Sequence, residues 1–383
     1  EAIDHNTQLL EKAQVIAREK GILPPEWQDA RYISVRGQGD RKIYRDSMGR
    51  AWRIMDFIDG QIFVSYRDVP IADRITMAHS HGAAIATFGA MLATIPKEEW
   101  AQPLPRLHDH EYHRDYLKAI LEGKEVPLSL NRAQPPITVQ MQQSVINGYE
   151  NGPARVRTLI DKLKKREYLV NSLDALGEGV MHNDTKLDNI MFRRDAQGRL
   201  QCIGFIDNDT IQLGNILDDL GDTLRYAANP LGDNPDSIED IVIDRELIAS
   251  MIEGFTGRIS KLYGQERADE LKPHLINAVK LYYYELCARL FADAIVGNRY
   301  FVQDPHRKGW RPDLNLHVAE AQMRALEELE KMSEEAVRTE VEMTEGALTQ
   351  VLSNLPTDKI NELVNQDVSR ETTIEIKTDA GIK

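Results

Sequence analysis

The segment His182-Asn-Asp-Thr-Lys-Leu-Asp-Asn189 contains three side chains whose types and spacing suit group transfer. Asp184 can orient an attacking hydroxyl group and accept its proton, as a general base does. Lys186 follows two residues later and faces the same side of an extended loop, where a cation stabilises negative charge on a transferred group. The amide oxygen of Asn189 is a hard ligand of the kind that Mg²⁺ prefers. We expect a base, a cation and a metal ligand to lie together here.

A second stretch of the same region supplies carboxylates. After a hairpin turn at 195–198, an apolar run ends at Asp207, and Asp209 follows two residues later. The pattern His-x-Asp-x-Lys-x-x-Asn, followed after 18 residues by a carboxylate that ends an apolar strand, matches the catalytic loop and metal-binding aspartate of protein kinases. Phosphoryl transfer needs positioning and charge compensation rather than covalent chemistry by the protein. The two stretches therefore predict phosphoryl transfer, with Asn189, Asp207 and Asp209 as metal ligands.

A purely structural interpretation of these residues is the alternative. Asp184 and Asn189 could stabilise a turn, and Asp207 could mark the end of a strand. For His182 we favour the structural role, in which the side chain holds the loop rather than taking part in catalysis. For the other three, two matched motifs joined by a hairpin of suitable length argue against chance.

The composition limits the partners and the location of the chain. With 383 residues, 42% apolar and 28% charged, the sequence is typical of a globular protein with a sizeable core. Its net charge of -14 would repel a phosphate backbone, so no nucleic-acid partner is expected. The sequence shows no stretch of about 18 apolar residues, so no membrane span is expected. Cys202 and Cys287 lie in apolar runs without zinc or disulfide spacing, which favours buried thiols and the cytoplasm.

The spacing of apolar residues predicts the elements that must position these side chains. Residues 1–20 favour an amphipathic helix, and residues 32–58 a small antiparallel meander. Gly82, in a helical stretch at 71–95, would allow close contact with another helix. Further helices are expected at 213–226, 239–261, 265–297 and 314–337.

Two other motifs could be mistaken for ligand sites. The pair Gly37-x-Gly39 lacks a third glycine, so we interpret it as a hairpin turn rather than a phosphate-binding loop. The histidines in His108-Asp-His-Glu-Tyr-His113 match neither the HExxH helix nor the spacing of a zinc finger. A polar helix start is the better interpretation.

The motifs at 182–189 and 206–210, together with Asp219-Leu-Gly-Asp-Thr-Leu-Arg225, resemble those of the aminoglycoside phosphotransferase-like family of small-molecule kinases. Within that family they most resemble N-acetylhexosamine 1-kinases. The resemblance implies an α+β, protein-kinase-like fold of two lobes, with a small, incomplete β-rich N-lobe and a large helical C-lobe. On this basis residues 1–59 form a partial N-lobe and residues 60–340 the C-lobe. A tail of unknown role follows at 341–383.

The resemblance also implies a reaction, which is transfer of the γ-phosphoryl group of ATP, with Mg²⁺, to the anomeric hydroxyl of an N-acetylhexosamine. It makes Asp184 the general base and Asn189 and Asp207 the Mg²⁺ ligands. The lobes would be connected by residues 56–60, and the nucleotide-binding residues there would be Asp56, Phe57 and Ile58. The sugar site would be lined by Arg289, Asp293 and Tyr300. Spacings of four and eleven residues place these three on one face of a helix, where a structural ion pair is the simpler alternative.

Other functions remain open. An amino alcohol, homoserine or an aminoglycoside would keep the reaction and change the acceptor. The family also places a glycine-containing turn and an ATP-facing lysine before the helix at 1–20, and the printed sequence contains neither. They lie upstream of Glu1, or nucleotide-binding machinery has been lost. The second case would fit a non-catalytic pseudokinase that binds partners through its tail, although such a protein has no chemical need for the set of catalytic residues.

Overall fold

The computed structural model describes residues 1–124, 138–299, 306 and 309–332. The chain divides into two compact units, Glu1–Leu329 and Glu330–Lys383. The strands and the helices with defined ends belong to the first unit. The tail at 341–383 lies outside the described residues, and the lobe boundary expected near residue 60 stays a prediction.

The N-terminal segment forms the expected helix and meander. α1, Ala2–Glu19, buries an apolar face that consists of Leu9, Leu10, Ala13 and Ala17. The meander is thin, because β1, Tyr44–Arg45, pairs only with β2, Ala51–Trp52, and a single bridge joins Tyr32 to Met55. The buried Lys42 ammonium group lies 2.8 Å from the Glu11 carboxylate of α1, and this ion pair ties the meander to the helix.

Two pairs of antiparallel strands flank the predicted catalytic and metal-binding residues at 182–189 and 207–209. β3, Glu178–Met181, pairs with β6, Gln212–Asn215, and β4, Ile190–Arg194, pairs with β5, Leu200–Phe205. The hairpin turn predicted at 195–198 is confirmed between β4 and β5.

The prediction that a helix begins at residue 213 is wrong. Residues 213–215 belong to β6, and α6, Asp218–Ala228, begins three residues later. Gly214 and Asn215 are poor helix formers, and pairing with β3 satisfies their backbone groups.

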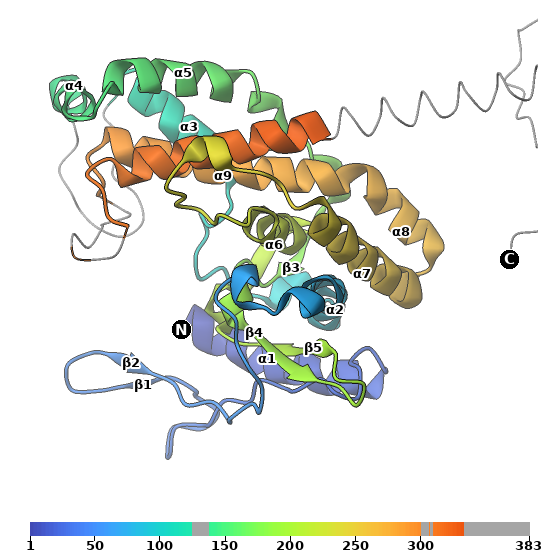
Figure 1. Ribbon diagram of the computed structural model, residues 1–383. Helices are drawn as coiled ribbons and strands as arrows, with labels where there is room; N and C mark the ends of the chain where they lie inside the picture. The colour runs from blue at the N-terminus through green and yellow to red at the C-terminus, as the bar shows by residue number, and fades with distance from the viewer. Residues whose placement is uncertain (125–137, 300–305, 307–308, 333–383) are drawn as a thin grey trace, which may run out of the picture. The chain divides into compact units, whose positions relative to one another are not determined.

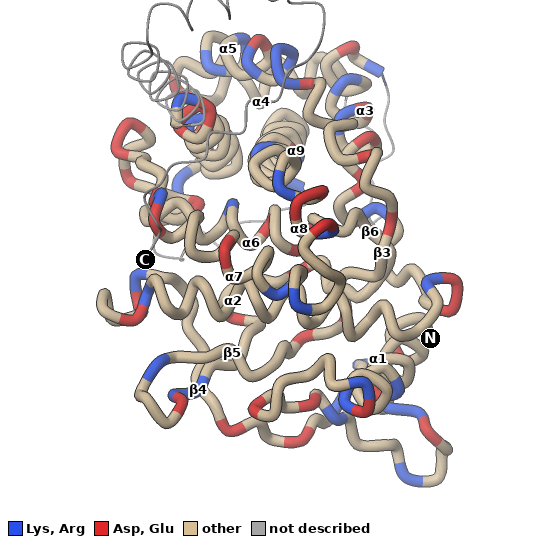
Figure 2. The backbone as a smooth tube through the Cα atoms, turned by 90° about the vertical axis from the view of Figure 1, so that its right-hand side faces the viewer, with Lys and Arg blue, Asp and Glu red and all other residues tan. Residues whose placement is uncertain are grey.

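α2, Ile71–Leu92, is the central helix of this unit. Figure 1 shows it between the β4–β5 hairpin and α7, Arg245–Tyr263, and it packs on both. Apart from Asp73 and Arg74 in its first turn, the helix carries no Asp, Glu, Lys or Arg (Figure 2). A Cβ atom at Gly82 would lie 1.9 Å from the Met251 carbonyl oxygen of α7, so the close helix contact predicted for Gly82 is confirmed.

The remaining helices with defined ends are α3, His110–Leu121; α4, Val139–Gly148; α5, Gly152–Lys164; α8, Gln265–Leu271; and α9, Leu275–Ile295. Residues 314–332 are also helical. The polar helix start expected at 108–113 is confirmed, because Asp109 caps α3 by accepting the Tyr112 N–H at 2.9 Å. The single helix expected over 265–297 is divided by a short 3₁₀ turn at Pro273, which lacks the N–H that would continue it.

Small antiparallel strands beside a large helical part give the α+β, two-lobed, kinase-like fold that the sequence predicts. Cys202 and Cys287 are free and buried, as expected. Among the described helices, none combines the length and the apolar character that a membrane crossing requires.

We predict that Gly82→Ala lowers the free energy of unfolding by about 1–3 kcal/mol, because the new methyl group must push the backbones of α2 and α7 apart. Gly257 of α7 is a matched control, since a Cβ atom there meets nothing within 4 Å. Gly257→Ala should stabilise the protein by up to about 1 kcal/mol through helix propensity. Urea denaturation measures both variants. Equal stability of the two would contradict the close packing.

Candidate active site

The loop that follows β3 is held by one buried carboxylate. Both oxygens of Asp219, at the start of α6, accept backbone hydrogen bonds, from the N–H of His182 at 2.9 Å and from that of Asn183 at 2.7 Å. The Thr185 hydroxyl donates to the Asp219 carbonyl oxygen at 2.9 Å. Burial raises the pKa of Asp219 to about 7, although the two N–H donors oppose this. The position of the loop therefore depends on α6.

Asn183 bends the loop. Its φ of 63° lies in the left-handed region, which asparagine tolerates better than most residues. The side-chain amide donates to the carbonyl oxygens of Met181, Thr210 and Gln212, at 3.0, 3.2 and 3.2 Å. One side chain thus joins the end of β3 to the chain that enters β6.

The structure brings Asp184, Lys186 and Asn189 together. The Asn189 side-chain amide donates to the carbonyl oxygen and to the Oδ2 atom of Asp184, at 2.9 Å each. The Lys186 ammonium nitrogen lies 3.2 Å from the same Oδ2 atom. Burial raises the pKa of the Asp184 carboxyl group, and Lys186 and Asn189 oppose this only in part. Burial would lower the pKa of Lys186, but the carboxylates of Asp184 and Asp188 outweigh it and raise that pKa.

His182 is enclosed by aromatic rings. Its ring centroid lies 5.4 Å from that of Phe88 and 5.6 Å from that of Phe205. Burial lowers the pKa of His182 to about 4, so the ring is neutral at physiological pH. Its Nε2 atom lies 3.2 Å from the Ile206 carbonyl oxygen, and its Nδ1 atom accepts the Asp184 N–H at 3.3 Å. These contacts support the loop-holding role over a catalytic one.

The hairpin places Asn189 and Asp207 at the same end, because the Ile206 N–H donates to the Asn189 carbonyl oxygen at 2.9 Å. The Asn189 side-chain nitrogen is engaged with Asp184, which leaves its oxygen available to a ligand. No hydrogen bond or ion pair joins the Asp207 carboxylate to the described residues. Such an amide oxygen and carboxylate suit Mg²⁺, which takes its other ligands from water and phosphate. The described residues contain no group of three or more His, Cys, Asp or Glu side chains that could hold an ion unaided.

Asp209, the third predicted metal ligand, is engaged differently. Its carboxylate forms an ion pair with the Arg53 guanidinium group. That group also lies over the Tyr32 ring, 4.7 Å from the ring centroid. Arg53 thereby connects the meander to the end of the hairpin, and a metal ion on Asp209 would have to compete with it.

The segment predicted to bind the nucleotide lies against the same hairpin. Ile58 is buried with Met191 and Ile203 of the hairpin strands. Phe57 is 90% exposed, and the Asp56 backbone N–H donates to the Arg31 carbonyl oxygen, just before the meander. The nucleotide-binding role of these residues stays a prediction.

Two of the three residues predicted to line a sugar site, Arg289 and Asp293, lie on α9. The Arg289 Nη1 atom lies 3.0 Å from the Oε1 atom of Glu285, one turn earlier in the helix. Asp293 accepts a hydrogen bond from the Asn315 side-chain amide at 2.9 Å. Tyr300 lies outside the described residues.

A half-buried histidine, His108, connects α9 to the loop. The Nε2 atom of His108 lies 3.0 Å from the Asn183 carbonyl oxygen, and its Nδ1 atom lies 3.2 Å from the Glu285 carboxylate. The Nδ1 atom of His110 lies 2.7 Å from the same carboxylate. Burial disfavours the charged form of His110, but Glu285 and Asp218 outweigh it and raise its pKa to about 10. The sequence interpretation gave His108 and Glu285 no catalytic or binding role.

A carboxylate oriented by an amide and a lysine, at the end of a hairpin in a kinase-like fold, is the arrangement of a phosphotransferase. The chain belongs to the phosphotransferase enzyme family, whose model matches residues 31–240, or 210 of the 383 residues. It is therefore a phosphotransferase.

Three solved structures of other proteins are similar to this chain. An aminoglycoside phosphotransferase from Alicyclobacillus acidocaldarius shares 15% identity over 88% of this chain and 85% of that one, with a TM-score of 0.47. An ethanolamine kinase from Plasmodium vivax shares 13% identity over 84% and 71%, with a TM-score of 0.43. A choline kinase from Cryptosporidium parvum shares 10% identity over 78% and 74%, with a TM-score of 0.41.

The raised pKa of Asp219 predicts a pH dependence of stability. Its pKa is about 7 in the folded state, against an ordinary value of 3.8, so the folded state binds more protons between these two pH values. Raising the pH through this window therefore favours unfolding. Compared with Asp219→Asn, which does not titrate, the wild type should lose stability between about pH 4 and 7, by roughly 4 kcal/mol at most.

Urea denaturation of both proteins at several pH values measures the difference between their free energies of unfolding. The other titrating groups are the same in both proteins, so their contributions to this difference largely cancel. A difference that stays constant from pH 4 to 7 would contradict the raised pKa.

Proposed function

We propose that the protein transfers the γ-phosphoryl group of ATP to the anomeric hydroxyl group of an N-acetylhexosamine in the cytoplasm. The observation that carries this proposal is the Asp184 carboxylate, which Asn189 and Lys186 orient at the end of the hairpin where Asp207 also lies. Membership of the phosphotransferase enzyme family supports the reaction class. The sugar acceptor rests on the sequence resemblance and on the charges around α9.

The loop residues have separate roles in this reaction. The acceptor hydroxyl group donates to Asp184, whose raised pKa makes it a better proton acceptor. Lys186 stays charged at neutral pH and stabilises negative charge on the phosphoryl oxygens. Asn189 and Asp207 would hold Mg²⁺, which when bound neutralises charge on the phosphates.

The compensated charge of Glu285 on α9 favours a neutral, hydroxyl-rich acceptor over a cation. The buried Glu285 carboxylate is already surrounded by His108, His110 and Arg289. It therefore leaves no uncompensated negative charge to attract an ammonium group. A sugar with hydroxyl and amide groups can hydrogen-bond to Arg289 and Asp293 without adding a charge.

An assay of ADP release distinguishes the candidate acceptors. The acceptors are N-acetylglucosamine, N-acetylgalactosamine, choline, ethanolamine, homoserine and an aminoglycoside. We expect an N-acetylhexosamine alone to stimulate ADP release, by at least about tenfold over the others, with the phosphate on the anomeric oxygen by ³¹P NMR. Stimulation by a cationic acceptor alone would overturn the sugar assignment. Absence of ADP release with every acceptor, although ATP binds, would favour a pseudokinase.

We predict that Asp184→Ala lowers turnover of the preferred acceptor by at least about 10²-fold, the scale of a lost general base, with a modest change in ATP affinity. Asp188→Ala is the matched control, because Asp188 lies in the same loop, 4.0 Å from the Lys186 ammonium group, and is more exposed than Asp184. The control should stay within about tenfold of wild-type turnover. Near wild-type turnover in Asp184→Ala would refute the assignment of the base.

A further inference from the structure

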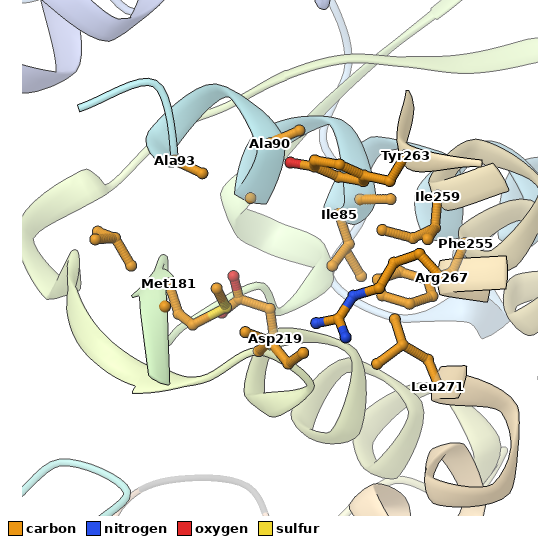
Figure 3. Close-up of a pocket in the computed structure, with 15 residues that line it drawn as sticks. Ile85, Ala90, Ala93, Met181, Asp219, Phe255, Ile259, Tyr263, Arg267 and Leu271 are labelled. Atoms are coloured by element: carbon orange, nitrogen blue, oxygen red, sulfur yellow. The ribbon is translucent and has the colours of Figure 1, made fainter. Parts of the chain in front are cut away.

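A cavity of about 260 Å³ lies behind the loop, on the side of α2, β3, α7 and α8 (Figure 3). Its walls are mainly apolar and include Ile85, Ala90, Val180, Phe255, Ile259 and Leu271. Gly89 of α2 also lines it, and a Cβ atom there would meet nothing within 4 Å. The volume falls just below the roughly 300–1,000 Å³ of sites for drug-sized ligands, which suits a molecule smaller than a nucleotide.

Three polar side chains line this apolar space: Asp219, whose two carboxylate oxygens already accept the backbone N–H groups of His182 and Asn183, and Arg267 and Tyr263. The Arg267 Nη1 atom donates to Glu270 at 2.5 Å, whereas its Nε and Nη2 atoms make no hydrogen bond to the described residues. Figure 3 shows the guanidinium group of Arg267 extending from α8 toward Asp219 and Met181. The Tyr263 hydroxyl group likewise makes no hydrogen bond within the described part of the chain, and Tyr263 lines the same cavity.

These groups define the chemistry of an occupant. A guanidinium group pairs most strongly with a carboxylate or another oxyanion, through its parallel N–H donors. The pair with Glu270 is exposed, so it competes weakly for Arg267. The apolar walls favour an occupant whose remaining surface is hydrocarbon. A small carboxylic acid with an apolar body satisfies both.

The cavity also touches the support of the loop. Met181 is the residue before His182, and Asp219 accepts the backbone N–H groups of His182 and Asn183. Both side chains line the cavity wall. An occupant therefore contacts the residues that hold the loop.

We propose that this cavity is a binding site for a small apolar carboxylate, such as a medium-chain fatty acid, with the carboxylate on Arg267 and the hydrocarbon chain against α2 and α7. The site is separate from the phosphoryl-transfer site and does not depend on the acceptor of that reaction.

Isothermal titration calorimetry of the full chain with octanoate tests the proposal. We expect octanoate to bind the wild type, and octanol and octylamine to bind at least about tenfold more weakly, the effect of one lost charge-assisted contact. Gly89→Leu fills the cavity and should abolish octanoate binding. Gly257→Leu is the matched control on an exposed position of α7, where a Cβ atom also meets nothing within 4 Å, and it should bind octanoate as the wild type does.

A second pair of variants tests whether the positive charge of Arg267 binds the carboxylate. Arg267→Gln should weaken octanoate binding at least about tenfold and leave octanol binding unchanged. Lys272→Gln, which removes an exposed cation just beyond α8, should change neither. The proposal is overturned by a wild type that does not bind octanoate, by octanoate binding that survives Gly89→Leu, or by equal octanoate affinity in Arg267→Gln.

Discussion

The hydrogen bonds from the backbone of His182 and Asn183 to the Asp219 carboxylate are the interaction on which the rest of the site depends. An unpaired buried N–H group costs about 1–3 kcal/mol, so both donors need an acceptor. Asp219 supplies it from the first turn of α6, where the helix dipole also favours a negative charge. The loop that carries Asp184 is therefore positioned by a helix of the large helical part rather than by its own strands alone.

The same peptide segment is fixed from its other side. His108 contacts the Asn183 carbonyl oxygen and the Glu285 carboxylate, which also holds Arg289. Removing one partner from a buried set of charges is strongly destabilising, so the cluster holds α9 and the loop in a fixed relation. Under the proposed function, Asp184 on the loop and the residues of α9 would then act on one acceptor without independent movement.

Local sequence spacing predicted the parts of the site that lie within one loop. Asp184, Lys186 and Asn189 are five residues apart at most, so the turn itself brings them together. Gly82 was also predictable, because a glycine within an apolar helical stretch indicates close packing. The family motif that begins at Asp219 could have pointed to its role, which spacing alone did not show.

Contacts between distant segments leave no such signal. The pair of His108 with Asn183 spans 75 residues, and that of Arg53 with Asp209 spans 156. Neither changes the apolar periodicity of either segment, which is the property that a single sequence reveals. β6 was mistaken for helix for a related reason, since a four-residue strand gains its stability from its partner β3 rather than from its own residues.

Amide hydrogen exchange tests the central claim most directly, because it reports local opening residue by residue. The backbone N–H groups of His182 and Asn183 should be protected in the wild type. In Asp219→Ala they should exchange at least about tenfold faster, while the amides of the β4–β5 hairpin remain unchanged. Unchanged protection of His182 and Asn183 in that variant would show that the loop is held without Asp219 and would contradict the account.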